Sequence, residues 1–456
     1  MKLTLLKDLA VREPRSVRFL SSHGYVVIAR RVSNKEERKI PMRSLLVNNS
    51  NFFRVRSDYE YYVGEDAVQA VYEHFMPDVA DISQKKSPEG SGSESALPNF
   101  GEDYSKVEGL SEEKRVQLVR EQARRLEEVT KKTSAKEASQ VLVDTAVQTM
   151  MANRAMLEQA LRMSNAEAQR YTKEMAEATE EMVRGTELVL RNDFYETDLI
   201  AQLVKRSTGT VVQHMTRVYL MGFAFLLYYN TEFLQTSLAN TIRIQFPQRY
   251  RAFYKRLLPH LDENELTLER VFWDGMRALT FPEIRKIAMG FLLHDVGKTD
   301  DIEYHEGEKG YDREVIVRHV KIGYKAVIEK SAYPREAALI TGYHHEYYGH
   351  PAGYGYFREF LAEYKHMNPA AKIDFLMSYE MEPLIDYQVL AYFPAKMLEV
   401  VDVFDSLTDP HRLYRKALSP QEAIDLMYSE FIENNSKLDP IIMDLFHRFL
   451  TERGSL

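Results

Sequence analysis

The sequence predicts a mainly α-helical protein that carries a small α/β or mainly β domain at its N-terminus. Beyond residue 110, apolar residues recur every three or four positions, as in the run Val116, Val119, Ala123, Leu126 and Val129. In residues 1–80, short β-branched and aromatic runs alternate with turn residues instead. Because the chain has 456 residues, we expect two or three folded units.

Residues 1–80 are expected to form a separate small domain with a sensory or docking role. Strands are predicted at 16–20, 25–32 and 51–55. The runs are interrupted by the turn residues His23-Gly24, Ser33-Asn34-Lys35 and Asn48-Asn49-Ser50. A helix is predicted over 66–75. This part of the sequence has no phosphate-binding loop and no cluster of metal-ligating residues, so we expect the chemistry to lie elsewhere.

A flexible linker is predicted over residues 83–104, which are too polar and too rich in Gly, Ser and Pro to form a core. A helical connector is then predicted over 110–194. Ser134 and Glu137 have the spacing of a capping box before a second helical stretch that runs towards Glu187. The connector either packs on the neighbouring domain or forms the stalk of a homodimer, because its apolar seam is not sustained over enough heptads to decide.

Composition excludes several classes of protein. The chain has no cysteine, so disulfides, zinc-thiolate sites and thiol nucleophiles are excluded, and any metal must be bound by histidine and carboxylate. A net charge of −8 gives no general attraction to a nucleic acid polymer. Charged residues interrupt the N-terminus too early for a secretory signal, and the apolar run over 218–229 is too short to span a bilayer. We expect a cytoplasmic protein that does not bind membranes.

Residues 195–456 are predicted to be helical throughout, and the histidines concentrate here. Eight of the thirteen lie between His294 and His411. Thr280 and Glu283 predict a helix start, which would place His294 and Asp295 at the C-terminal end of that helix, where Gly297 can stop it. A lone histidine at this place is most often a hydrogen-bonded core residue. The adjacent aspartate, with Lys298 three residues further on, favours a functional site.

Paired histidines and a second aspartate extend this pattern. His344 and His345 end a helical run that starts at Pro334, and adjacent helical residues point about 100° apart, so that one metal ion seldom binds both. An exposed polar pair is the alternative interpretation. Asp402 lies on an apolar helical face, where a carboxylate is costly unless a cation or several donors compensate it. A structural salt bridge is the alternative there.

Taken in order, these residues resemble the HD-GYP family, the bacterial cyclic di-GMP phosphodiesterase branch of the HD superfamily. The resemblance covers roughly half of the chain, from His214 to about Phe446. It rests on His214-Met215-Thr216-Arg217-Val218, His294-Asp295-Val296-Gly297-Lys298, Arg318-His319, Ile322-Gly323, His344-His345-Glu346, Val401-Asp402-Val403-Phe404-Asp405-Ser406-Leu407-Thr408 and Arg412-Leu413-Tyr414-Arg415-Lys416-Ala417-Leu418-Ser419-Pro420.

The resemblance implies an all-helical domain over residues 195–456 that holds two divalent metal ions, usually iron or manganese in this family. The implied ligands are His214, His294, Asp295, His319, His344, His345 and Asp402, with Asp295 bridging the two ions. A hydroxide between the ions would attack phosphorus, and Lys298 would neutralise a phosphate oxygen or help to protonate the leaving group. The implied substrate contacts are Arg217, Gly353, Tyr354, Arg412 and Arg415.

The sequence departs from the family pattern at three places. Thr210 stands where some members have a glutamate for a third metal, which favours two ions. The signature loop lacks the family's aspartate, has an extra residue before Gly353-Tyr354, and has Gly355 in place of the terminal proline, so we expect a less preorganised loop. A long aromatic insertion follows over 358–392. These departures affect the substrate more than the metals.

Two functions from different classes follow. In the first, the protein is a metal-dependent phosphodiesterase that opens a cyclic dinucleotide, with cyclic di-GMP as the first candidate, to linear pGpG and onward to GMP. In the second, the altered loop has made it a receptor that binds a nucleotide or a diguanylate cyclase (GGDEF) partner and signals through the connector. A related HD phosphohydrolase acting on another phosphate ester is a third interpretation.

Overall fold

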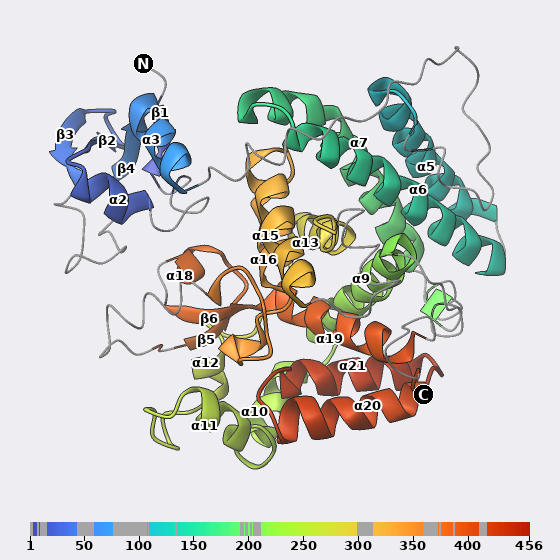
Figure 1. Cartoon of the computed structure of the whole chain (residues 1–456). Coiled ribbons are helices and arrows are strands. Elements are labelled where there is room, and N and C mark those ends of the chain that lie inside the picture. Colours follow the sequence, from blue (N-terminus) through green and yellow to red (C-terminus); the bar gives the residue numbers. More distant parts are fainter. Residues whose placement is uncertain are drawn as a thin grey trace. The chain divides into compact units, whose positions relative to one another are not determined.

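Helices account for most of the chain, and a small antiparallel sheet lies near its N-terminus (Figure 1), which confirms the predicted fold class. The computed structural model describes residues 3–6, 9, 16–42, 59–75, 107, 109–132, 135–191, 196, 199–200, 203, 211–298, 313–358, 373, 375–385, 388–409 and 417–456. The chain divides into two units. The first comprises Met1–Ser87, Phe357–Ile373 and Glu382–Gln388, and the second comprises the rest. The predicted strand at 51–55 and the linker at 83–104 lie outside the described residues.

The first unit contains a four-stranded antiparallel sheet in the order β1-β4-β2-β3. Its elements are β1 (Leu3–Leu5), α2 (Ser16–Ser22), β2 (Val26–Arg31), β3 (Glu37–Pro41), β4 (Tyr59–Gly64), α3 (Glu65–Phe75) and α18 (Glu382–Ile385). Alternate residues of the central strands, such as Val27 and Val63, are buried together with Leu20 and Val71 of the two helices. The strand predicted over 25–32 and the helix predicted over 66–75 are confirmed.

The strand predicted at 16–20 is wrong, because these residues begin helix α2. Ser16 and Leu20 are both fully buried, and their spacing of four residues is that of one helix face. The helix ends at Ser22, and Gly24 follows with a φ of 74° that favours glycine. There the amide of Tyr25 donates to Leu20 O (2.9 Å) and the amide of Gly24 to Ser21 O (3.2 Å), which is the Schellman pattern. The His23-Gly24 signal was therefore a helix end.

Within the described part of residues 110–194, the connector consists of α5 (Glu112–Lys132), α6 (Ala135–Leu161) and α7 (Asn165–Leu190). The single helical stretch predicted up to Glu187 is wrong, because Ser164 and Glu167 form a complete capping box that starts a new helix after a short turn. The sequence carried that signal. The capping box predicted at Ser134 lies outside the described residues.

The connector helices pack on the C-terminal helices of the same unit. Helix α6 contacts α9 (Val211–Gln235), and α7 contacts α13 (Phe281–Leu293). Arg285 Nε lies 2.7 Å from the buried Glu187 Oε2. The hydroxyl of Tyr333 contacts Asn153 of α6 and Thr179 of α7. These contacts agree with packing on the neighbouring helices, and the homodimer stays a prediction.

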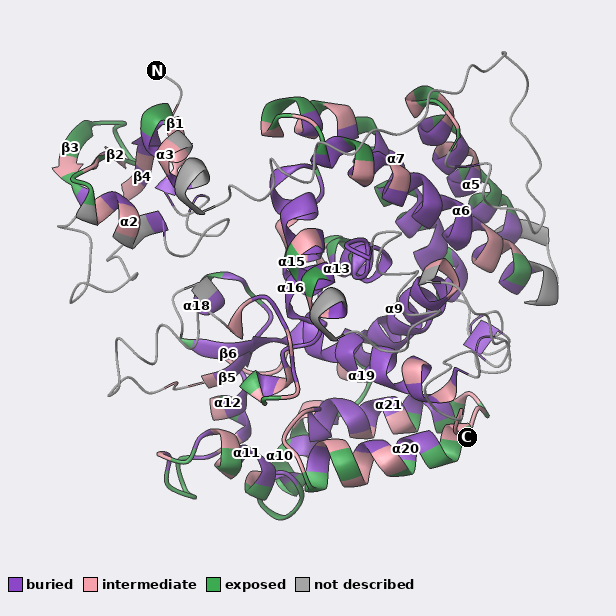
Figure 2. Cartoon of the chain, in the orientation of Figure 1, coloured by how far each residue is buried: buried purple, intermediate pink, exposed green. Residues whose placement is uncertain are grey.

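The remaining helices of the second unit surround a buried core. They are α10 (Leu238–Arg249), α11 (Arg251–Leu257), α12 (Leu268–Val271), α15 (Arg313–Glu329), α16 (Arg335–Tyr343), α19 (Phe393–Thr408), α20 (Pro420–Tyr428) and α21 (Pro440–Glu452). Figure 2 shows α9, α13 and α19 buried along most of their length, whereas α20 alternates between buried and exposed residues. Among the described residues, no helix is both long and apolar enough to cross a lipid bilayer.

The prediction that residues 195–456 are helical throughout is wrong in the long aromatic insertion. Strands β5 (Phe375–Ser378) and β6 (Val389–Tyr392) form a parallel pair. Met377 also bridges to Phe272, and the amide of Trp273 donates to Met377 O (2.8 Å). Both strands are short apolar runs that are buried on nearly every residue, and such runs cannot be distinguished from buried helix by periodicity.

Helix α13 begins at the capping box predicted from the sequence. Thr280 accepts from the amide of Glu283, and Glu283 Oε2 accepts from the amide of Thr280 (2.8 Å). Arg277 Nη2 also donates to Glu283 Oε1 (2.8 Å). Although burial alone would raise the pKa of Glu283, these hydrogen bonds lower it from 4.5 to about 2. Pro282 lies in the first turn, where it costs no hydrogen bond.

The Glu283→Gln variant is expected to lower the free energy of unfolding at pH 7 by about 1 kcal/mol or less, because the pair is partly exposed and screened. The carboxylate has a lower pKa in the folded than in the unfolded chain, so its contribution is complete above pH 4.5 and is lost as the pH falls towards about 2. Urea unfolding of both proteins at pH 7, 5 and 3 measures the difference. An equal difference at pH 7 and pH 3 would contradict the assignment.

Candidate metal centre

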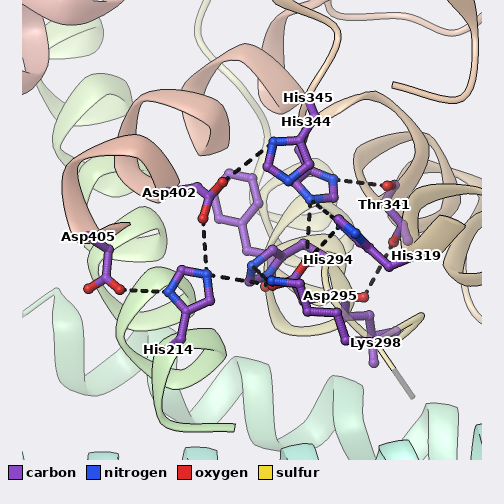
Figure 3. A network of polar contacts seen from close by, with 12 residues as sticks. His214, His294, Asp295, Lys298, His319, Thr341, His344, His345, Asp402 and Asp405 are labelled. Atoms are coloured by element: carbon purple, nitrogen blue, oxygen red, sulfur yellow. Dashed lines mark hydrogen bonds and ion pairs between the residues drawn. The ribbon is translucent and has the colours of Figure 1, made fainter. Parts of the chain in front are cut away.

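Five helices bring the predicted ligands to one place (Figure 3). His214 lies in the first turn of α9, His294 and Asp295 follow the end of α13, and His319 lies on α15. His344 and His345 follow the end of α16, and Asp402 lies on α19. All seven side chains are buried, with 6% of the surface of His345 exposed and less for the others. Since buried ionisable groups without compensation are costly, this convergence indicates a site.

Asp295 lies at the centre of the histidines. Its Oδ1 is 3.0 Å from His319 Nε2 and 3.6 Å from His344 Nε2. Its Oδ2 is 3.5 Å from both His214 Nε2 and His294 Nε2. The two oxygens of one carboxylate therefore face different pairs of imidazoles. A carboxylate in this position can serve two ligand groups at once.

Three of the imidazoles are oriented by the backbone of their own helix. The Nδ1–H groups donate to carbonyls three residues earlier: His294 to Phe291 O (2.9 Å), His319 to Ile316 O (2.5 Å) and His344 to Thr341 O (2.9 Å). Because a carbonyl can only accept, the proton of each neutral ring is on Nδ1. The Nε2 atoms therefore present lone pairs to the centre, as metal-binding histidines do.

Burial keeps most of these imidazoles neutral. It lowers the pKa of His294 to about 4, and it also lowers the pKa of His319 and, strongly, that of His345. Burial alone would raise the pKa of Asp295, but the charge of Lys298 holds it well below its usual range. Neutral imidazoles beside an ionised carboxylate are the protonation states in which these side chains bind a cation.

Two groups of these side chains could hold a metal ion. One consists of Asp295, His319, His344 and His345, and the other of His214, His294 and Asp295; in each, the ligand atoms lie within 4.8 Å of one another. Two buried nitrogens, His294 Nε2 and His345 Nδ1, have no hydrogen-bond partner. His319 Nε2 and His344 Nε2 face one another at 3.5 Å, although both rings carry their proton on Nδ1. Two lone pairs that face one another repel, and a cation between them would remove this repulsion.

Asp402 belongs to neither group but faces a member of each. Its Oδ1 is 3.0 Å from His214 Nε2, and its Oδ2 is 3.7 Å from His345 Nδ1. Burial would raise the pKa of Asp402, but the hydrogen bond from His214 and the nearby imidazoles lower it strongly. The carboxylate is thus held in its ionised form, which is the form that a metal ligand requires.

No protein-family model, no curated protein and no solved structure matches the chain. The resemblance to the HD-GYP family therefore rests on the residues quoted from the sequence and stays a prediction.

Asp405 is a residue of this centre that the sequence reasoning did not single out. Its Oδ2 accepts from His214 Nδ1 (2.7 Å), and Arg217 Nε is 2.8 Å from its Oδ1. Burial alone would lower the pKa of His214, but the hydrogen bonds to Asp402 and Asp405 outweigh it and raise the pKa to about 9. Asp405 comes three residues after Asp402 on α19, and this spacing on one helix face was the available signal.

The Asp405→Asn variant is expected to weaken metal binding by about 10- to 100-fold, because the partner that orients His214 becomes a poorer acceptor. Competition with a chromogenic chelator measures the metal affinity. Asp425→Asn is the control, since Asp425 is exposed and accepts from Gln421. Equal metal affinity in the Asp405→Asn and Asp425→Asn proteins would show that His214 does not need this partner.

The two adjacent histidines differ from the expectation for a helix. Helix α16 ends at Tyr343, and His344 is already its C-terminal cap, so the angle of about 100° per residue does not apply to them. Their ring centroids lie 4.0 Å apart, and both belong to the same candidate ligand group. The prediction that one ion seldom binds both His344 and His345 is therefore not supported at this helix end.

Gly297 serves close packing and does not end the helix, which corrects the prediction. Helix α13 already ends at Leu293, and Gly297 is not among the residues with positive φ. A Cβ atom added to Gly297 would lie 2.0 Å from His319 O and 2.6 Å from the amide nitrogen of Gly323. The glycine therefore lets α15 approach the segment that follows α13, and this approach brings His319 to Asp295.

The loop after His345 folds back onto that histidine. The amides of Tyr354 and Gly355 donate to His345 O at 2.8 and 3.2 Å, and the ring of Tyr354 lies 4.3 Å from the ring of His345. Gly353 is buried, and its amide donates to His350 O (2.8 Å). A Cβ atom on Gly355 would lie 2.3 Å from the side chain of Glu346. Although Gly355 stands where the HD-GYP pattern has a proline, backbone hydrogen bonds hold the loop at this place.

Lys298, a predicted catalytic residue, and Arg217, a predicted substrate contact, both lie near the metal centre. Lys298 Nζ lies 2.8 Å from Asp295 Oδ2 and is buried. Arg217 is also buried and pairs with Asp405. The predicted phosphate contacts Arg412 and Arg415, and also Thr210, lie outside the described residues.

Proposed function

We propose that the protein is a metal-dependent phosphodiesterase of the HD-GYP type that hydrolyses a cyclic dinucleotide, with cyclic di-GMP as the first candidate. The observation that carries the proposal is the pair of candidate ligand groups that share Asp295, with Lys298 beside the shared carboxylate. A shared carboxylate between two groups of imidazoles fits two ions better than one. We therefore propose two ions, with Asp295 as the bridge and Asp402 as an additional ligand.

The resemblance to the HD-GYP family implies iron or manganese, and the donor set can bind either metal. It consists of imidazole nitrogens and carboxylate oxygens, and the chain has no thiolate to offer. Such borderline and hard ligands are typical of iron and manganese sites. When bound, two such ions would polarise a phosphodiester and supply a nucleophilic water at neutral pH.

The chain's own residues have separate tasks in this proposal. Asp295 and the three backbone-oriented histidines fix the position of the ions. Lys298 carries a buried positive charge next to Asp295, from where it would stabilise the negative charge that develops on a phosphate oxygen or protonate the leaving ribose oxygen. Tyr354, which lies against His345 and is only partly buried, offers an aromatic surface for a nucleobase.

Product analysis tests this proposal. Protein loaded with iron or manganese is incubated with cyclic di-GMP and, in parallel, with other cyclic dinucleotides and simple phosphate esters. We expect cyclic di-GMP to be converted to linear pGpG and then to GMP. Binding of the nucleotides without any product would contradict the proposal and favour a receptor, and the capture of a GGDEF protein would then name its partner. Turnover of another ester alone would favour a different HD phosphohydrolase.

A further inference from the structure

A strained turn follows the paired histidines. Tyr347, Tyr348 and Gly349 have φ values of 47°, 52° and 75°, so three consecutive residues adopt the left-handed conformation. This conformation is unfavourable for any residue with a Cβ atom. Two tyrosines in a row adopt it only where the surrounding structure holds them there. The residues that hold this turn are therefore informative.

Glu399 of α19 holds the first of these residues. Its Oε1 accepts from the amide of Tyr347 (3.0 Å). Its other oxygen contacts the ammonium of Lys396, which also donates to Lys437 O (2.9 Å). Glu399 and Lys396 are fully buried. The pair belongs to neither candidate ligand group, so metal binding does not explain why two charges are buried here.

Two further contacts hold Tyr348. Its hydroxyl donates to Asp439 Oδ2 (2.7 Å), which also accepts from Tyr254 (2.8 Å). The ammonium of Lys396 lies 3.8 Å from the centre of the Tyr348 ring. Asp439 is fully buried, and its other oxygen caps α21. The buried acids and the lysine thus converge on the left-handed turn from two helices, α19 and α21.

The turn determines where the following loop lies. It reverses the chain after His345, with His350 donating to Tyr347 O (2.9 Å). Five residues after the turn, Tyr354 is back at His345, where its amide donates to the carbonyl and its ring lies against the imidazole. If the turn relaxed to right-handed geometry, the chain direction would change before Tyr354 and this return would be lost.

We propose that Glu399, supported by Lys396, is a positioning residue that holds the Tyr347–Gly349 turn and so places Tyr354 against His345. The inference rests on the proposed function only in that Tyr354 would then orient the substrate's base. Glu399 acts through the loop and touches neither metal nor substrate.

Two matched double variants isolate the hydrogen bond from the charges. Lys396→Met with Glu399→Gln removes both charges but keeps an oxygen that can accept from the amide of Tyr347. Lys396→Met with Glu399→Leu removes both charges and the acceptor. Neither double variant leaves an unpaired buried charge. A single change of Lys396 or of Glu399 to an apolar residue would leave the charge of its partner unpaired.

Amide hydrogen exchange of a peptide that spans residues 345–356 is the first readout, because it does not depend on turnover. The Leu variant is expected to exchange about tenfold faster than the Gln variant in this peptide, which corresponds to one lost hydrogen bond. Metal content should be equal in both. Equal exchange in the two variants would overturn the inference. So would a loss of metal in the Leu variant alone, because Glu399 would then act on the ligands.

Tyr348→Phe provides a second test should a double variant fail to fold. It removes only the hydroxyl that reaches Asp439, and faster exchange of the same peptide is expected. Tyr250→Phe is its control, since the Tyr250 hydroxyl donates to a different carboxylate, Asp444 Oδ2 (2.6 Å). Equal exchange in the Tyr348→Phe and Tyr250→Phe proteins would overturn the role of this network.

Turnover separates the inference from the proposed function. If cyclic di-GMP is hydrolysed, the Leu variant should show a KM raised about tenfold with a smaller change in kcat, since substrate binding is affected more than the chemistry. If no substrate is hydrolysed, the proposed function fails, while the exchange result still decides whether Glu399 holds the turn.

Discussion

The Asp295→Ala protein is expected to bind neither metal ion and to have no phosphodiesterase activity. Asp295 contacts four of the five ligand histidines through its two oxygens, at 3.0 to 3.6 Å, and it belongs to both candidate ligand groups. Loss of a residue that merely orients a ligand weakens metal binding by about 10- to 100-fold, so loss of the shared ligand should weaken it more than 100-fold. Elemental analysis of purified and reconstituted protein measures the metal content.

Asp444→Ala is the matched control for this experiment. Asp444 also accepts from several side chains. Arg249 is the last residue of α10, Tyr250 follows it, and Tyr428 is the last residue of α20, and all three lie outside both ligand groups. This variant shows whether the loss of a partly buried carboxylate elsewhere lowers the metal content by destabilising the fold. Full metal content in folded Asp295→Ala protein would show that the carboxylate does not bridge two ions.

The parts of the site that could be predicted from the sequence are those encoded by residue type and local spacing. Thr280 and Glu283 define the start of α13, and the length of that helix places His294 and Asp295 at its end. Asp402 could be identified because a carboxylate on an apolar helical face is costly without a partner, and His344 because it forms an adjacent pair with His345. All seven predicted ligands come together, although His214 and His319 were expected as ligands only because of the resemblance to the HD-GYP family.

The contacts that depend on tertiary distance could not be predicted. Gly297 is explained by an approach of α15 that no local pattern encodes. Asp405 was visible as a helical neighbour of Asp402, but only the structure shows that it reaches His214 on α9. The left-handed φ values of Tyr347 and Tyr348 contradict local preference, and buried groups on α19 and α21 maintain them.

The errors in the fold have the same origin. Residues 16–20 were predicted as a strand because of their composition, although the spacing of Ser16 and Leu20 suits a helix that covers the sheet. Strand β6 has no polar residue in a position that reveals a period of two, because both of its faces are buried. In β6, the sequence pattern therefore fails because neither face of the strand is exposed.

The Lys298→Met protein is expected to keep its metals while kcat falls by about 10²- to 10³-fold, as when one group that stabilises transition-state charge is removed. Lys298 Nζ lies 2.8 Å from Asp295 Oδ2, close to the proposed ions. A positive charge at this place repels cations, so its removal should leave metal binding unchanged or make it tighter. Elemental analysis and steady-state kinetics on the same preparation measure the two effects.

The combination of retained metal and lost turnover distinguishes Lys298 from the ligands, which should lose both. Lys330→Met is the control. Lys330 follows the end of α15 and is also buried, but its ammonium donates to Met163 O of the connector (2.6 Å) and not to a residue of the metal centre. An unchanged kcat in the Lys298→Met protein would mean that the lysine only balances the charge of Asp295. Loss of metal together with activity would place Lys298 among the groups that build the centre, because its charge would then be needed to keep Asp295 ionised before the ions bind.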